Sequence, residues 1–440
     1  MAGAKAPAFR GIGSIASGQT VRKTRILFIG EAITLSHISR PLVLAQTLDP
    51  ALYEVIFACD HRLRGLLKLP KHCRFVPLTS RMHGTNIDRF TDLRDELYDL
   101  PTFEAYIAED LDLFERYFPD VVVGDMRLSL NISARLADIP YMNIQSCYWH
   151  PEARTDLRVP AAPFSASLSA RTVNLIANVF APVATLYPNL LAVKYGLRPP
   201  GPDFRKTLCD GDHILFPDIP DWSPLSTVPS NATYVGPLVW APDVPKPAWW
   251  GQIDTARPIV YVSLGSSGQP RLLQMIVEVG VALGFQMIVA TAGRTRIEPV
   301  PGQVFVADFL DGGAVAKMAV LAICNGGSTA APQALRAGCP VLGITSNMDQ
   351  AAFMALLARG KASLELPESS VNQGALRTAL TTLTADGSYA AGAKRLSSAI
   401  RRVSRRNAFT TAIDSCLVSR RKPIAAVRIH NPTGVRAGVS

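Results

Sequence analysis

An apolar run that breaks at a glycine turn and continues as a helical pattern constrains this chain most strongly. The run from Met318 to Cys324 predicts a buried strand, which ends at Asn325-Gly326-Gly327. The helical pattern that follows ends at Gly338-Cys339-Pro340. A helix that begins at such a turn presents N–H groups and its positive dipole end, which suits a phosphate. A Gly-Gly turn alone is equally compatible with an ordinary strand–helix connection in a doubly wound sheet.

The next predicted strand favours a phosphate-binding site at this turn over an ordinary strand–helix connection. Val341-Leu342-Gly343-Ile344 is followed closely by Asp349 and Gln350. Open α/β sheets bind ligands beyond the carboxyl ends of their strands. We therefore expect this carboxylate and amide to lie near the glycine turn.

These motifs together resemble a known one. Asn325-Gly-Gly, Gln333-Ala-Leu, Gly338-Cys-Pro and Asp349-Gln350 are similar to the nucleotide-sugar-binding motif of family-1 glycosyltransferases. The resemblance implies the GT-B fold, an α/β architecture in which two Rossmann-like parallel-sheet domains face each other across a cleft. It also implies a nucleoside-diphosphate sugar as co-substrate, with a uridine or a thymidine nucleotide, and no other cofactor.

Two positions depart from the family pattern. Asn325 stands where a histidine usually contacts the diphosphate, and Gln333 stands where a glutamate usually holds the ribose. Both keep the ability to form hydrogen bonds and lose charge or titration. They leave open a catalytically silent nucleotide-sugar-binding or partner-activating protein. A nucleotide-sugar epimerase can share the fold, but it would need acid and base groups at the donor that these motifs do not supply.

The resemblance implies donor-binding residues in the turns of the second domain. Phe309-Leu310 corresponds to the loop that reads the base, although an apolar pair at a helix entry is equally normal in a core. The implied set is Gly265, Ser266, Ser267, Phe309, Leu310, Asn325, Gly326, Gly327, Ser328, Thr329, Gln333, Asp349 and Gln350.

His37 follows the first predicted strand, Arg25 to Gly30, and precedes a predicted helix that begins at Pro41. A lone loop histidine is more often a surface residue, but its spacing to Leu44-Ala45 matches the register of the family's catalytic histidine. The resemblance assigns Asp125, at the end of the apolar run from Pro119, as its partner, whereas an acid there could also cap the next helix. The implied chemistry is inverting transfer, with His37 as the base.

Two segments are expected near the acceptor. Tyr148 and Trp149 follow the predicted strand 139–144, and they could face an acceptor or pack in the core. Residues 155–200 are rich in proline and apolar helical stretches and resemble an acceptor-side insertion. An exposed apolar helix there would suit a small or lipophilic acceptor and shallow membrane contact, but we expect its apolar side chains to be packed in the core. The charged segment between Arg81 and Arg116 predicts a solvated helix.

The length of 440 residues predicts two domains. We expect a flexible leader at 1–23, an acceptor-binding domain at 24–238, a proline-containing linker at 239–257, a nucleotide-sugar-binding domain at 258–395, and a C-terminal helix with a basic tail at 396–440.

Composition narrows the partners and the location. The net charge of +10 is dispersed and no nucleic-acid motif occurs, which argues against nucleic-acid binding. Seven scattered cysteines without a CxxC pair predict buried thiols and no metal site. No signal-peptide pattern or apolar run of membrane-spanning length occurs, so we expect a cytoplasmic protein. The arginine-rich tail leaves peripheral contact with an anionic membrane open.

Overall fold

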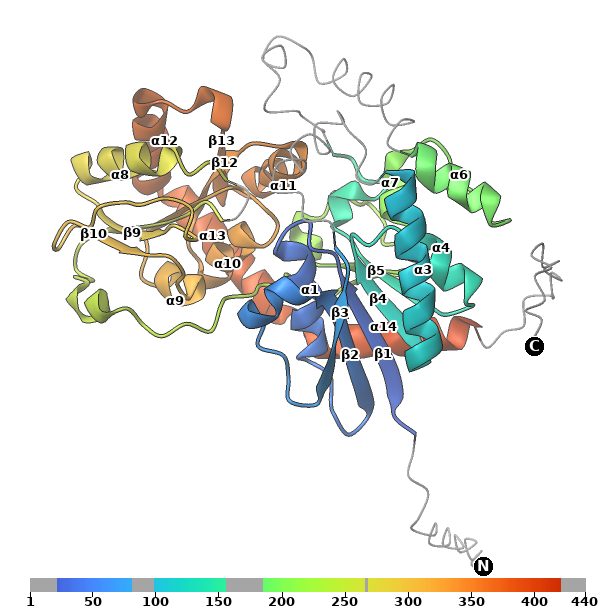
Figure 1. Ribbon diagram of the computed structural model, residues 1–440. Helices are drawn as coiled ribbons and strands as arrows, with labels where there is room; N and C mark the ends of the chain where they lie inside the picture. Colours follow the sequence, from blue (N-terminus) through green and yellow to red (C-terminus); the bar gives the residue numbers. More distant parts are fainter. Residues whose placement is uncertain (1–21, 81–98, 156–184, 266–267, 421–440) are drawn as a thin grey trace, which may run out of the picture.

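The computed structural model describes residues 22–80, 99–155, 185–265 and 268–420. They form two α/β domains, each built on its own parallel sheet (Figure 1). The predicted α/β architecture with two parallel sheets is therefore confirmed. The domain boundaries expected above stay predictions.

The first sheet has seven parallel strands in the order β3-β2-β1-β4-β5-β6-β7. Its central strands are nearly all apolar and are buried, as strands covered on both faces must be. The strands are β1 (Thr24–Gly30), β2 (Tyr53–Asp60), β3 (Cys73–Leu78), β4 (Val121–Asp125), β5 (Tyr141–Ile144), β6 (His213–Phe216) and β7 (Ala232–Tyr234).

Helices cover this sheet and position the residues at its edge. They are α1 (Ser36–Ala45), α3 (Leu100–Tyr117), α4 (Leu130–Leu136), α6 (Leu186–Lys194) and α7 (Phe204–Leu208), with short 3-10 turns η1 (His61–Leu66), η2 (Cys147–Trp149) and η3 (Pro220–Trp222). The helix predicted to begin at Pro41 begins earlier, at Ser36, so Pro41 lies inside it. Because proline has no N–H, the carbonyl of His37 receives no helical bond from position 41.

The second sheet has six parallel strands in the order β10-β9-β8-β11-β12-β13. The strands are β8 (Ile259–Ser263), β9 (Gln286–Ala290), β10 (Val304–Ala307), β11 (Leu321–Cys324), β12 (Val341–Thr345) and β13 (Ser363–Pro367). The helices and turns are η4 (Ala248–Gln252), α8 (Leu272–Ala282), α9 (Gly312–Ala316), α10 (Ala330–Ala337), α11 (Met348–Arg359), η5 (Glu368–Ser370), α12 (Gln373–Ala385) and α13 (Gly387–Arg402).

The last described helix, α14 (Arg405–Arg420), returns to the first domain, where Figure 1 shows it beside the first sheet. Its Phe409 is fully buried, with its ring centroid 6.1 Å from that of Phe28 in β1. The preceding α13 packs on the second domain, where Ser397 donates to the carbonyl of Arg336 over 2.8 Å. The two helices therefore tie the domains together.

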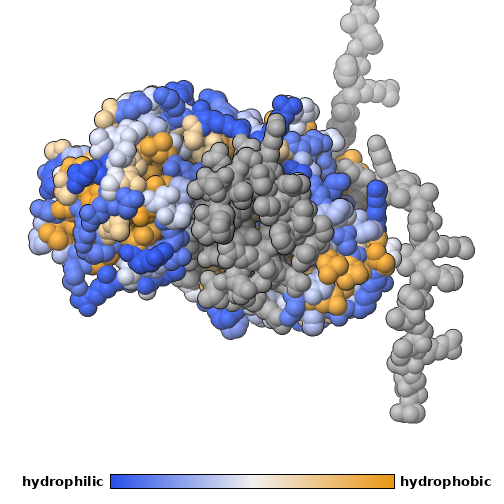
Figure 2. Space-filling view, turned by 90° about the horizontal axis from the view of Figure 1, so that it is seen from above, coloured by the Kyte–Doolittle hydropathy of each residue, from blue (hydrophilic) through white to orange (hydrophobic). Residues whose placement is uncertain are grey.

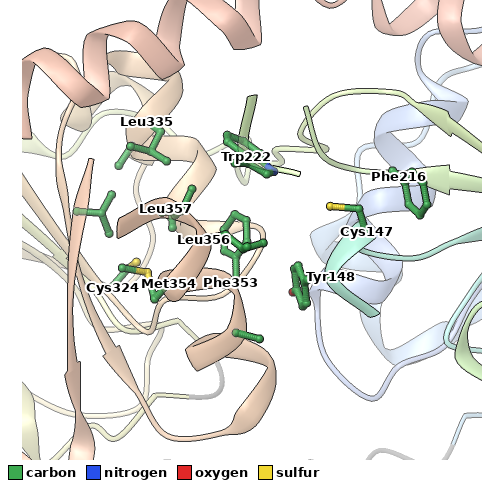
Figure 3. Close-up of a cluster of buried hydrophobic side chains, with 14 of the residues drawn as sticks. Cys147, Tyr148, Phe216, Trp222, Cys324, Leu335, Phe353, Met354, Leu356 and Leu357 are labelled. Atoms are coloured by element: carbon green, nitrogen blue, oxygen red, sulfur yellow. The ribbon is translucent and has the colours of Figure 1, made fainter. Parts of the chain in front are cut away.

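An apolar cluster also joins the domains. The ring of Tyr148, in η2, lies 5.7 Å from that of Phe353 in α11, and Figure 3 shows the two pointing toward each other. Trp222 approaches Phe353 edge-on at 5.8 Å. Aromatic pairs at such separations stabilise a contact beyond the area they bury.

The seven cysteines lie within the described residues, form no disulfide and, except for Cys73, are buried. Across the described ranges, no helix combines the length and the apolar character needed to cross a membrane. In the same part of the chain, no group of three or more histidine, cysteine or acidic side chains is placed to hold a metal ion.

Candidate functional site

The sheet order brings His37 and Asp125 together although 88 positions separate them. Asp125 ends β4, which pairs with β1, and Gly30 at the end of β1 is its register partner. His37 lies in the first turn of α1 and places Nδ1 2.8 Å from Oδ1 of Asp125. Asp125 is fully buried, whereas 17% of the His37 side chain is exposed. The pair can therefore exchange a proton with a bound molecule through the imidazole.

Asp125 does not cap the following helix, which was the alternative left open. The residue at the cap position of α4 is Ser129, whose side chain forms no cap hydrogen bond. Both carboxylate oxygens of Asp125 instead accept from Arg40: Nε reaches Oδ2 at 2.7 Å and Nη2 reaches Oδ1 at 2.6 Å. Sequence reasoning missed Arg40, although its position three residues after His37 places both on one helix face.

A second polar cluster lies beside this pair and was also missed. Arg127 is fully buried and donates to Glu31 at 3.0 Å, Glu109 at 2.8 Å and Asp110 at 3.1 Å. Glu31 directly follows β1, and its N–H donates to the carbonyl of Asp125. The Arg127 cluster thus braces the ends of β1 and β4, the two strands that position His37 and Asp125.

The Arg127 cluster corrects the prediction of a solvated helix between Arg81 and Arg116. Asp110, in α3, is fully buried, and its carboxylate also accepts from Ser129 and Ser133. Burial raises the pKa values of Glu31 and Asp110, and Arg127 opposes the rise in both. The charged residues of this segment predicted a helix face in water, but the buried guanidinium of Arg127, which lies outside α3, pairs with two of its carboxylates. Residues 81–98 lie outside the described residues.

On the second domain, the glycine turns after β8 and β11 adjoin. Gly265 (φ +63°) and Gly326 (φ +75°) have left-handed backbones that favour glycine. A Cβ added at Gly265 would lie 3.6 Å from Nδ2 of Asn325, and one added at Gly326 would lie 2.7 Å from Cγ of Met354. The Asn325 amide oxygen accepts from the N–H of Gly327 at 3.1 Å and so holds the turn.

The helix that follows this turn begins without a side-chain cap. Thr329 stands at the cap position of α10, and its side chain forms no cap hydrogen bond. Its Oγ1 is buried and has no hydrogen-bond partner. Gly327, Ser328 and Thr329 are half-buried. A hydroxyl and helix N–H groups gathered at the positive end of a helix dipole fit an anionic group.

The other expected donor residues have different surroundings. Gln333 donates to the carbonyl of Trp240 over 3.3 Å, and a Cβ added at Gly312 would meet its Oε1 at 2.2 Å. It therefore lies between α9 and the segment that links the domains. Phe309 is 40% exposed, whereas Leu310 is buried in the core. Ser266 and Ser267 lie outside the described residues.

Asp349 connects the two domains. Its Oδ1 accepts from the Tyr148 hydroxyl at 2.9 Å and from the Trp149 indole N–H at 2.7 Å. Both aromatic side chains are buried and belong to the core cluster, which is one of the two placements left open for them. The neighbouring Gln350 accepts from the N–H of Ser346 at 2.8 Å and so fixes the start of α11. Asp349 and Gln350 lie at the carboxyl end of β12, beside the turn after β11, as expected.

Tyr148→Phe removes one of the two donors to Asp349 and keeps the ring in the core. Because hydrogen bonds to a carboxylate are stronger than neutral ones, we expect the free energy of unfolding to fall by about 1.5–3 kcal/mol. Chemical denaturation measures the loss. Tyr234→Phe is the matched control, since the Tyr234 hydroxyl donates to the neutral hydroxyl of Ser223. Equal losses in both variants would contradict a special contribution from Asp349.

Comparison with known proteins identifies the family. No protein-family model matches the chain. It is 41% identical over 386 residues to the "PGL/p-HBAD biosynthesis glycosyltransferase" of Mycobacterium tuberculosis, covering 86% of this chain and 89% of the relative. It is 37% identical over 396 residues to the "PGL/p-HBAD biosynthesis rhamnosyltransferase" of Mycobacterium bovis, covering 88% and 86%.

Solved structures show the same fold. The spinosyn rhamnosyltransferase SpnG in complex with thymidine diphosphate superposes with a TM-score of 0.63 at 19% identity, covering 89% of this chain and 100% of SpnG. The sequence identities to the two mycobacterial proteins extend over nearly the whole of each. This chain therefore belongs to the family of GT-B glycosyltransferases that contains those mycobacterial enzymes.

Proposed function

We propose that this glycosyltransferase moves a sugar, with inversion, from a nucleoside-diphosphate sugar to a hydroxyl of a small or lipophilic acceptor. The observation that carries the proposal is the His37–Asp125 pair, held at 2.8 Å at the carboxyl edge of the first sheet. Inversion requires a single displacement, in which the base takes the acceptor proton as the oxygen attacks the anomeric carbon.

His37 has the geometry of such a base. When Nδ1–H donates to Asp125, Nε2 carries the lone pair that accepts the proton of the acceptor hydroxyl. Asp125 then orients the imidazole and stabilises its protonated form. Catalysis of this kind requires a buried carboxylate and an imidazole that the acceptor can reach. Asp125 is fully buried and His37 is partly exposed, which meets both requirements.

The leaving nucleoside diphosphate develops negative charge, which the turn after β11 is built to receive. The N–H groups at the start of α10, the hydroxyl of Thr329 and the dipole of the helix supply fixed partial positive charge. Gly265 and Gly326 let the backbone approach the phosphates closely. Asn325 keeps the turn closed, so its replacement of histidine is compatible with binding.

The acceptor class follows from the relatives and from one exposed helix face. Both relatives are named for PGL/p-HBAD biosynthesis, so we infer an acceptor of that pathway's kind for this chain.

Leu186, Leu190 and Val193 of α6 are exposed and share one face by helical spacing. Seen from above, hydrophobic patches lie on both domains among hydrophilic residues (Figure 2). Residues 156–184, expected on the acceptor side, lie outside the described residues. Membrane contact stays a prediction.

Calorimetric titration with uridine and thymidine diphosphates and their sugars tests the donor half of the proposal. We expect one nucleotide series to bind without added metal, because N–H groups and a dipole replace a cation. Nuclear magnetic resonance of the product then reports whether the anomeric configuration inverts. Failure of every nucleotide to bind would contradict the proposal and favour a partner-activating protein, whereas retention of configuration would contradict the single displacement.

Gln333→Ala tests whether this side chain contacts the donor. If its amide bonds the ribose, nucleoside diphosphate affinity should fall by about 1–2 kcal/mol, which is roughly 5- to 30-fold. Gln333→Glu, which restores the family's usual residue, should retain binding. Gln274→Ala is the control, because Gln274 lies on the exposed surface of α8. Unchanged affinity in Gln333→Ala would limit Gln333 to its contact with the Trp240 carbonyl.

A further inference from the structure

Arg40 is a third member of the His37–Asp125 pair that the proposed mechanism does not use. It lies one turn after His37 on α1, and its side chain is only 3% exposed. Its guanidinium spans both oxygens of Asp125, at 2.7 and 2.6 Å. Planar, two-point pairing of this kind fixes the orientation of a carboxylate as well as its charge.

The same guanidinium also touches the imidazole. Nη2 of Arg40 lies 3.0 Å from Nδ1 of His37, and Nδ1 lies 2.8 Å from Oδ1 of Asp125. Nδ1 can donate to Asp125 only when it carries a proton, and it can accept from Arg40 only when it does not. The first arrangement leaves a lone pair on Nε2, and the second leaves Nε2 protonated. A protonated imidazole would place a second positive charge against Arg40.

We propose that Arg40 is a positioning residue that lowers the proton affinity of His37 by orienting Asp125, sharing its negative charge and opposing the imidazolium with its own. This inference rests on the proposed function in one respect: the proton affinity of His37 matters for catalysis only if His37 is the base. The contacts themselves are independent of the reaction.

The charged and titratable groups around Arg40 come from four helices, strands or turns and from the segment after β6. Asp125 belongs to β4 and His37 to α1, Tyr148 belongs to η2, Asp349 lies in the first turn of α11 in the second domain, and Asp218 follows β6. Burial alone lowers the pKa of Arg40, but Asp125, with smaller contributions from Tyr148 and Asp349, raises it above its ordinary value. Arg40 therefore stays charged, and its guanidinium contacts both the carboxylate of Asp125 and the imidazole of His37.

Arg40→Met tests the inference through the titration of His37. Removal of the cation leaves Asp125 free to stabilise an imidazolium, so the titration midpoint of His37 should rise by about 1 pH unit or more. Nuclear magnetic resonance of histidine-labelled protein measures it, with the His37 signal assigned by its loss in His37→Gln. Since the base must be neutral, the acid limb of kcat/KM should move to higher pH by the same amount.

A matched control and a second variant sharpen the test. Arg62 pairs through two nitrogens with the buried Asp60 at the end of β2, and its own side chain is half-exposed. Arg62→Met therefore removes a two-nitrogen pair with a buried carboxylate on the neighbouring strand. It should leave the His37 midpoint unchanged. If Arg40→Met does not fold, Arg40→Gln removes the charge but keeps a donor for Asp125, and the same rise is expected.

An unchanged or lowered midpoint in the folded neutral variant would overturn the inference. The same holds if Arg62→Met raises the midpoint equally, because the effect would then be a general loss of cations. The titration needs no substrate, so it is decided separately from the proposed function. If His37→Ala retains turnover, the base role fails, whereas the measured midpoint still judges Arg40.

Discussion

His37→Ala should reduce sugar transfer by about 10²- to 10⁴-fold, the contribution that a positioned general base makes to a transfer step. Nucleoside diphosphate affinity should stay unchanged, because the turns proposed to bind the donor lie on the second domain and His37 lies on the first. Turnover with saturating donor and calorimetric binding of the nucleotide separate the two effects.

His61→Ala is the matched control for this loss. His61 also belongs to the first domain, and 72% of its side chain is exposed. It should keep both turnover and nucleotide affinity. Preserved turnover in His37→Ala would remove His37 from the base role, and a parallel loss of nucleotide affinity would indicate a general disturbance of the fold.

Arg127→Met should give the largest loss of stability. It removes the cation that contacts Glu31, Glu109 and Asp110, and breaking a buried charge pair from one side costs about 3–5 kcal/mol. Denaturant unfolding at neutral pH measures the loss. Arg116→Met removes an exposed pair with Asp112 on α3 and should leave the unfolding midpoint nearly unchanged.

The loss in Arg127→Met should shrink at acid pH. Burial already raises the pKa values of Glu31 and Asp110 above 4.5 and 3.8, and removal of Arg127 raises them further. The folded state then binds more protons than the unfolded state as the pH rises above those ordinary values, so its stability falls with rising pH. A loss that is independent of pH would show that packing of the side chain, and not its charge, accounts for the effect.

The fold was largely predictable because the evidence for it is local. Continuous apolar runs such as 26–29 and 121–123 predict buried parallel strands, and the glycine turn after Cys324 predicts the start of a helix. The structure has strands and a helix at these places. The start of α1 was misplaced, since a proline that marks a first turn by preference can also lie inside a helix.

The candidate site was predictable where the resemblance to the family indicated which residues, far apart in the sequence, lie together in the fold. His37 and Asp125 meet only because β1 and β4 are neighbours in the sheet, and no local pattern in the chain encodes that strand order. The resemblance supplied it, and the 2.8 Å contact agrees with the expected pairing. Their catalytic roles stay predictions.

The sequence by itself determined the elements and the turns, since strand periodicity, glycine backbones and helix ends depend on near neighbours. Tertiary structure alone decided how polar residues are used. It turned Tyr148 and Trp149 toward Asp349 in the other domain, set Arg40 across Asp125, and buried Asp110 beside Arg127. The identity of a charged residue in the sequence does not reveal whether its side chain lies in water or in a core. Its role depends on the partner that folding brings within hydrogen-bond distance, and burial makes that partner indispensable.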